Sequence, residues 1–321
     1  MSLPESLSEN MSLPLIGAPL FIISNPDLVI AQCRAGIIGS FPALNARPES
    51  LLDDWLFQIK EALAQPSDTP VAPFAVNQIC HPSNKRLEHD VRLCVKHKVP
   101  IVITSLSPPA EIVQAVHSYG GLVFHDVINV RHARKAAEQG VDGLILVAAG
   151  AGGHAGPLSP FALVQEVRDW FKGTIILSGA IATGQAVAAS LTMGADLAYS
   201  GTRFIATTEA NAQPEYKQML VDSGANDIIY SSLFTGVAGN YLKPSISRAG
   251  LDPDNLPEGD KDLMDFEKLS GGSKAWKDIW GAGQGLGAID SVEDTATVVA
   301  ELSREFHQAI QDLSQSSWSK K

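Results

Sequence analysis

Short apolar runs alternate with amphipathic segments at a regular spacing through the first part of the chain. The apolar runs are continuous patches rich in Val, Ile and Leu, which is typical of parallel strands covered on both faces. Eight of them predict strands, at residues 14–22, 36–41, 73–77, 100–105, 121–126, 143–148, 174–179 and 196–201.

Helical patterns separate these strands, over residues 26–35, 48–64, 84–97, 109–119, 129–139, 160–171 and 183–193. Asn25-Pro26 is a helix start signal, and Gly36, Gly120 and Gly140 are stop signals. Eight strands with helices between them predict an α/β fold, a (β/α)₈ TIM barrel. A doubly wound sheet is the alternative, but it has no reason to stop at eight strands.

The regular spacing ends after the eighth strand. Residues 209–288 mix helical fragments with polar and glycine-rich stretches, and a final helix over 291–313 follows, with Ser291 as its candidate N-cap. We therefore expect a barrel made of residues 1–208 and 289–321. The smaller insertion, 209–288, is expected to lie over the barrel mouth and to shape the substrate pocket.

Composition limits the partners. The chain has 321 residues and a net charge of −11, and its 24 basic residues form no block, which argues against nucleic acid and membrane partners. No apolar stretch approaches the roughly 18 residues that span a bilayer. Cys33, Cys80 and Cys94 have no zinc spacing, so we expect reduced thiols in a cytoplasmic protein.

The carboxyl ends of the strands are where a barrel places its chemistry. The loops after the last two strands contain Ser178, Gly179, Ala180, Gly201 and Thr202. Each is a small-residue turn leading into a helix, where free N–H groups favour an anion, so together the loops predict a phosphate site. The alternative is that these glycines only make tight turns.

Two histidines lie at strand ends. His125-Asp126 ends the fifth strand, but adjacent strand residues point to opposite faces, so we expect no metal there. His154 lies in the glycine-rich loop after the sixth strand, "LVAAGAGGHAGPLSP". Such glycines suggest a backbone that turns tightly or lies close to something flat. A core histidine is the other interpretation.

Three motifs in order, "AGGHAG" (151–156), "LSGAIATG" (177–184) and "YSGTRFIAT" (199–207), resemble those of the nitronate monooxygenases. The resemblance runs from "LIGAPL" near residue 15 to "WGAGQGLGAI" near 285. It implies a TIM-type barrel that binds FMN without a covalent bond.

The resemblance also implies roles for individual residues. His154 would be the catalytic base over the flavin, with Gly152, Gly153 and Gly156 letting the loop pass close to its flat ring. Gln284 would close over the cofactor. The residues implied to bind FMN are Ala18, Pro19, Leu20, Asn77, His125 and Gly153 around the ring and ribityl chain, and Ser178, Gly179, Ala180, Gly201 and Thr202 at the phosphate.

Two positions depart from the family pattern. Gly150 stands where members often carry Glu, and Asp126 stands where some carry Lys. A carboxylate that points inward would disfavour an anionic flavin. The departures therefore concern how the protein would balance negative charge on the reduced flavin.

The activity implied is FMN-dependent oxidation of alkyl nitronates, and of nitroalkanes, by O₂ to a carbonyl compound and nitrite. An NAD(P)H-dependent quinone or enoyl-acyl-carrier reductase of the same barrel is the alternative, because fold alone does not settle function. A flavin-binding sensory protein is a third interpretation. The expected assembly is a monomer or a homodimer.

Overall fold

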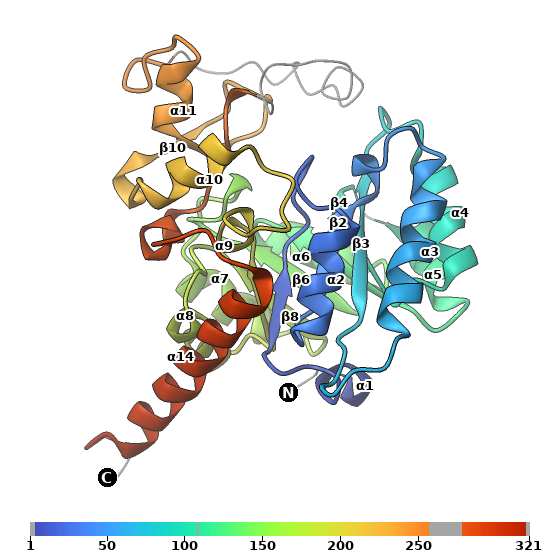
Figure 1. The fold of residues 1–321 in the computed structure, drawn as a ribbon. Coiled ribbons are helices and arrows are strands. Elements are labelled where there is room, and N and C mark those ends of the chain that lie inside the picture. The colour runs from blue at the N-terminus through green and yellow to red at the C-terminus, as the bar shows by residue number, and fades with distance from the viewer. Residues whose placement is uncertain (1–3, 108, 257–277, 319–321) are drawn as a thin grey trace.

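The computed structural model describes residues 4–107, 109–256 and 278–318. Its main sheet has eight parallel strands in the order β1-β9-β8-β6-β5-β4-β3-β2 (Figure 1). The strands are β1 Leu15–Gly17, β2 Gly39–Pro42, β3 Phe74–Cys80, β4 Ile101–Leu106, β5 Leu122–Val127, β6 Gly143–Val147, β8 Thr174–Ser178 and β9 Leu197–Ser200. A parallel bridge between Ile16 and Ile38 joins the two edges. The predicted TIM barrel is therefore confirmed.

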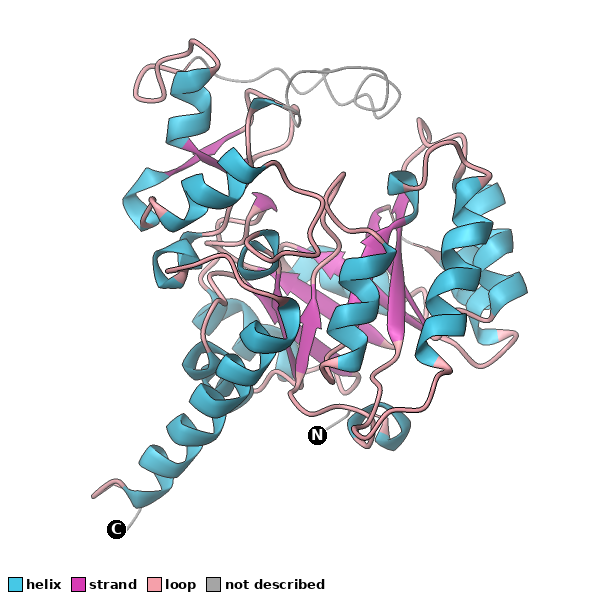
Figure 2. Cartoon of the chain, in the orientation of Figure 1, coloured by secondary structure: helices cyan, strands magenta, loops and turns pink. Residues whose placement is uncertain are grey.

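Helices surround the strands on the outside of the barrel (Figure 2). They are α2 Pro26–Arg34, α3 Leu51–Leu63, α4 Leu87–His97, α5 Ala110–His117, α6 Val130–Ala137, α7 Pro160–Arg168, α8 Gly184–Met193 and the last helix, α14 Thr295–Gln315. A short helix, α1 Glu5–Ser8, precedes β1. None of the described helices is long and apolar enough to cross a membrane.

Two hydrophobic layers result from the period of two along each strand. Residues such as Val123, Leu144 and Ile175 pack outward against the helices. Their neighbours, such as Phe124 and Ile145, fill the barrel interior. The described cysteines, Cys33, Cys80 and Cys94, are buried free thiols, and burial raises the pKa of each to about 12.

Two expected boundaries are wrong. The first strand ends at Gly17 rather than at residue 22, and residues 18–25 form a loop into α2. The last helix begins at Thr295 with Asp294 as its N-cap, whose Oδ1 accepts the Thr297 N–H at 2.8 Å. Ser291 is not the cap, because residues 291–294 run extended and Glu293 pairs with Thr207.

The insertion contains α10 Pro214–Val221, β10 Ile228–Ser231, β11 Gly239–Leu242 and α11 Lys243–Arg248. β10 and β11 form a small antiparallel sheet whose third strand is β7, Gly153–His154. β7 comes from the loop after β6, so the insertion pairs directly with the histidine loop. In Figure 1 this part, in yellow and orange, lies beyond the carboxyl ends of the barrel strands. Part of the predicted insertion, residues 257–277, lies outside the described residues.

Carboxylates at the start of two strands hold the backbone of the neighbouring strand. Asp142, before β6, accepts the Val123 N–H at 2.7 Å. Asp196, before β9, accepts the Ile175 N–H at 2.8 Å and also pairs with Arg168. Asp196 is buried, and these donors help to stabilise its charge.

We expect Asp196→Ala to lower the free energy of unfolding by about 2–4 kcal/mol, because the buried Ile175 N–H loses its acceptor and Arg168 loses its carboxylate partner. Asp196→Asn retains a carbonyl oxygen and should cost less. Denaturant unfolding followed by circular dichroism measures both. Exposed Asp68→Ala serves as the control and should change little. Equal midpoints for wild type and Asp196→Ala would contradict the assigned role.

Candidate active site

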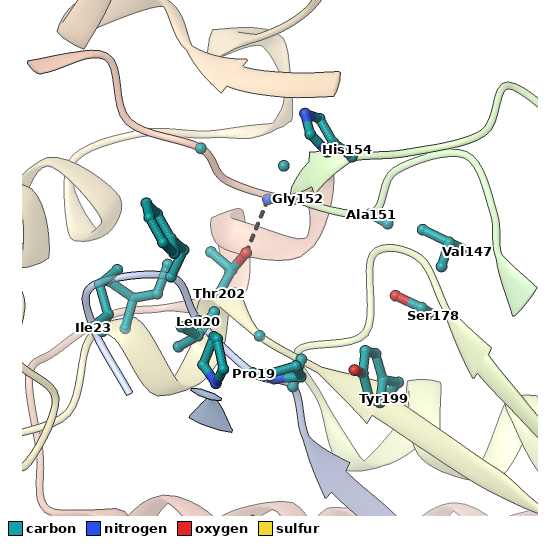
Figure 3. Close-up of a pocket in the computed structure, with 18 of the residues that line it drawn as sticks. Pro19, Leu20, Ile23, Val147, Ala151, Gly152, His154, Ser178, Tyr199 and Thr202 are labelled. Carbon is teal, nitrogen blue, oxygen red and sulfur yellow. Dashed lines mark hydrogen bonds between the residues drawn. The ribbon is translucent and has the colours of Figure 1, made fainter. Parts of the chain in front are cut away.

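The barrel floor follows from the alternation of side chains along each strand. Phe124, Ile145, Ile176 and Leu197 point inward, so the residues two positions further on also point inward, at the mouth. Those residues, Asp126, Val147, Ser178 and Tyr199, together with Ala18, Asn77 and Ser105, line the floor of one cavity of about 350 Å³. Figure 3 shows Val147, Ser178 and Tyr199 on this floor and His154 on the loop above.

Most of the predicted site residues meet in this cavity. Its lining includes Ala18, Pro19, Leu20, Asn77, Gly153, His154, Ser178, Gly179, Ala180, Gly201 and Thr202. These residues come from strands and loops that are far apart in the sequence, so only the closed barrel brings them together.

His125 and Gln284 are not placed in the cavity. His125 points out of the barrel, buried, with its Nδ1 2.8 Å from Thr104 Oγ1. The alternation that turns Asp126 inward turns its neighbour outward. The Gln284 side chain is exposed, and its backbone N–H donates to Gly150 O at 2.9 Å. Its Oε1 lies close to the same residue, 3.1 Å from where a Cβ on Gly150 would stand. Gly283 and Gly285 line the cavity instead.

The histidine loop is held by the insertion. Gly239 pairs with His154 and Asn240 with Gly153, and the Asn240 side chain donates to Ala151 O at 2.6 Å. A Cβ on Gly152 would lie 2.7 Å from the backbone of Gly283. The glycine there is therefore required by packing against another protein segment, and that it also serves a flat ring stays a prediction.

His154 is held in one tautomer. Its Nε2 lies 2.9 Å from Thr235 Oγ1, and the Thr235 hydroxyl donates to Val237 O at 3.0 Å. That hydroxyl therefore accepts from His154, so Nε2 carries the proton and Nδ1 the lone pair. Burial lowers the pKa of His154 to about 4. The imidazole is neutral at ordinary pH, and it is a weaker base than an exposed histidine.

A chain of hydrogen bonds crosses three adjacent strands at the cavity floor. The Asn77 amide donates to Ser105 Oγ at 2.9 Å, and Ser105 Oγ donates to Asp126 Oδ2 at 2.6 Å. Burial raises the pKa of Asp126 to about 6, although the bond from Ser105 lowers it. The sequence placed Ser105 at a strand end and Asp126 at a position that departs from the family pattern. It gave neither residue a binding role.

One wall of the cavity is apolar and was not predicted from the sequence. It includes Phe21, Ile22, Ile23, Leu44 and, from the insertion side, Tyr216 and Trp280. Ile22 is 41% exposed and has φ 69°, a left-handed conformation that is strained for a β-branched residue. The Asn45 side chain holds this turn, accepting the Ile22 N–H at 2.8 Å and donating to Leu20 O at 2.9 Å.

The predicted phosphate loops have donors, but Gly179 also has a local explanation. Gly179 has φ 148°, and a Cβ there would lie 2.8 Å from Ala149 O, so this turn needs glycine whether or not it binds an anion. The Ala180 N–H already donates to Gly150 O at 3.2 Å. The hydroxyls of Ser178 and Thr202 line the cavity and remain the side-chain donors in these loops.

Charge is sparse in this cavity. Among the described residues that line it, Asp126 is the one carboxylate and none is Lys or Arg. In the described part of the chain, no group of three or more His, Cys, Asp and Glu side chains could hold a metal ion.

The family model described as nitronate monooxygenase matches residues 6–248, most of the chain. The chain belongs to the nitronate monooxygenase family. This is a family of flavin-dependent oxidoreductases.

The proteins to which this chain is similar are named for different activities. A nitronate monooxygenase of Paraburkholderia phytofirmans is 26% identical over an alignment of 348 positions, gaps included, which covers 94% of each chain. An octahydro-indene carboxyl-CoA dehydrogenase of Rhodococcus jostii is 24% identical, over 73% of this chain and 63% of its own length. The solved nitroalkane oxidase of Streptomyces ansochromogenes is 21% identical with a TM-score of 0.80, covering 96% of this chain and 99% of its own, and shows the same fold.

We expect Gly239→Val to release the histidine loop, because a Cβ at this position would lie 2.6 Å from Gly153 O and would prevent β11 from pairing with β7. Hydrogen exchange of the backbone amides in residues 151–156 should quicken about tenfold or more as these bonds are lost.

Gly224→Ala is the control, since a Cβ there meets nothing within 4 Å. Unchanged exchange in Gly239→Val would mean that the insertion does not hold the loop.

Proposed function

We propose that this protein is an FMN-dependent oxidoreductase that oxidises alkyl nitronates, and nitroalkanes, with O₂ to a carbonyl compound and nitrite. The observation that carries the proposal is the meeting of a neutral imidazole, His154, with the Ser178 and Thr202 loops in one cavity at the carboxyl end of the barrel. Family membership supports a flavin, and the name of the Paraburkholderia relative supports the substrate class.

The lining residues fit FMN. A phosphate dianion needs N–H and O–H donors, and the Ser178 and Thr202 hydroxyls with the backbone of Gly179 and Gly201 would hold it, since none of the described lining residues is Lys or Arg. Ala18, Pro19 and Leu20 would contact the ring. When bound, the flavin would accept electrons from the substrate and pass them to O₂.

His154 would act on the proton of the substrate. A nitroalkane must lose a carbon-bound proton before it can be oxidised, whereas a nitronate has already lost it. Nδ1 is the ring nitrogen that would take this proton, because Nε2 is engaged with Thr235. A pKa of about 4 makes His154 a weak base, and this weak basicity favours nitronates over nitroalkanes as substrates.

The insertion is proposed to shape the substrate pocket, because Ala212, Tyr216 and Trp280 line the cavity on its apolar side. Apolar walls suit the alkyl part of a substrate. A cytoplasmic location and a monomeric or homodimeric state stay predictions.

The second candidate is an NAD(P)H-dependent flavin reductase. It is favoured by the Rhodococcus relative, which is named a dehydrogenase at nearly the same identity. Anaerobic NADH or NADPH would bleach the flavin of such a reductase, whereas a nitronate oxidase would keep its colour until a nitronate is added.

The purified protein is expected to be yellow and to release FMN, rather than FAD, on acid treatment. Ser178→Ala should weaken FMN binding about tenfold or more, because a hydrogen bond to a charged group is lost. Quenching of FMN fluorescence measures this affinity. Ser190→Ala is the control, since Ser190 is buried on α8 and bonds to Ala186 O. A colourless protein that FMN cannot reconstitute would reject the cofactor.

His154→Asn is expected to keep FMN and to lose about 10²-fold in nitroalkane oxidation, the low end for general base catalysis because the base is weak. Nitronate oxidation should fall much less. In the wild type, nitroalkane oxidation should show no loss from His154 protonation between pH 8 and pH 5, because its pKa is about 4 and the neutral base persists above that value. Steady-state oxygen consumption with each substrate measures both effects. Equal losses with both substrates would show that His154 binds or orients the substrate.

A further inference from the structure

Asp126 is a carboxylate on the cavity floor with an incomplete set of partners. Ser105 donates to its Oδ2 at 2.6 Å, while its buried Oδ1 has no hydrogen-bond partner within the described structure. No Lys or Arg lines the cavity among the described residues, so no cation there balances the carboxylate. A buried carboxylate without a cation normally destabilises a fold. Its presence here calls for a role beyond packing.

The titratable neighbours of Asp126 do not supply that balance. Tyr199 on β9 lines the cavity with it, whereas Cys80 on β3 packs on the outer side of the sheet, and both interact with it electrostatically. Burial raises the pKa of both groups, so each is neutral at physiological pH and neither offers positive charge. Taking up a proton would remove this uncompensated charge. The Asp126 pKa of about 6 lies close enough to neutrality for this to occur.

We propose that Asp126 is the proton-accepting group beneath the cofactor, taking up a proton from solvent when a flavin bound over the cavity floor gains negative charge. The inference rests on the proposed function for the presence of FMN. Two electrons and one proton leave one negative charge on the flavin. A second proton, taken up by the Asp126 carboxylate, removes the repulsion between the two groups. The reductant is the substrate or, in the experiment below, the reducing system added.

The test is the reduction potential of FMN in the holoenzyme between pH 5 and pH 8, measured by dye equilibration during slow enzymatic reduction. The potential gives the ratio of the affinities for reduced and oxidised FMN. Above pH 6 this ratio should fall about tenfold per pH unit in the wild type when it is compared with the ratio in Asp126→Asn. The two proteins should agree near pH 5, where the carboxyl is already protonated. Asp126→Asn should thus couple one proton fewer to reduction than the wild type does above pH 6.

Stability gives a readout that is separate from the flavin potential. The folded-state pKa of Asp126 is raised above its ordinary value of 3.8, so ionisation opposes folding above pH 6 and this cost disappears as the pH falls toward 3.8. Asp126→Asn holoenzyme should therefore have a higher Tm than the wild type at pH 8, with the difference shrinking toward pH 4. A variant of lower Tm at pH 8 would show that the carboxylate is structural and would overturn the inference.

Two further variants complete the design. Asp90→Asn is the matched control, because Asp90 is also buried but lies on α4 with Arg86 and His89 as partners, and it should leave the potential unchanged. Ser105→Ala removes the hydrogen bond that lowers the Asp126 pKa, so the pH at which the slope changes should rise. This variant tests the inference even where Asp126→Asn does not fold.

The outcomes separate the two proposals. A chain that does not bind FMN overturns the proposed function and this inference together. A chain that binds FMN, with the same potential and the same pH slope in wild type and Asp126→Asn, overturns this inference alone.

Discussion

The closed parallel barrel imposes a period of two on every strand, and the candidate site depends on it. Side chains that face inward must fill a narrow interior, so Phe124, Ile145 and Ile176 leave no space below the mouth. The next inward residue of each strand then has a cavity above it. Asp126 and Ser178 therefore share one floor, although they are far apart in the sequence. Pairing of Ile16 with Ile38 closes the ring that makes this possible.

The insertion supplies what the barrel lacks, a rigid support for the histidine loop. Backbone pairing with Gly239 and Asn240 turns this loop into a strand, and Thr235 orients the imidazole ring. Close backbone contacts explain Gly152 and Gly239. The same enclosure removes water, which lowers the pKa of His154 and raises that of Asp126. Burial thus prepares a neutral base and a carboxyl that titrates near neutral pH in one cavity.

Several features around the cavity cost stability. Asp126 lacks a cation among the described lining residues, and Ile22 adopts a left-handed backbone conformation. Away from the site, local choices agree with the fold, as Asp196 shows by satisfying a strand N–H and an arginine together. Unfavourable local choices of this kind are tolerated at functional sites.

The sequence by itself determined the eight strands, the helices between them and the loops that line the site, because continuous apolar runs, caps and glycine stops are local signals. The sequence also predicted that side chains alternate along β5, so that His125 and Asp126 lie on opposite faces. Only the tertiary structure decided which of the two faces the cavity, because that depends on where Phe124 packs. It also decided that Asp294 rather than Ser291 caps the last helix, and that the backbone of Gln284 bonds to Gly150. These outcomes depend on contacts between distant segments, such as Glu293 with Thr207, and no local pattern encodes them.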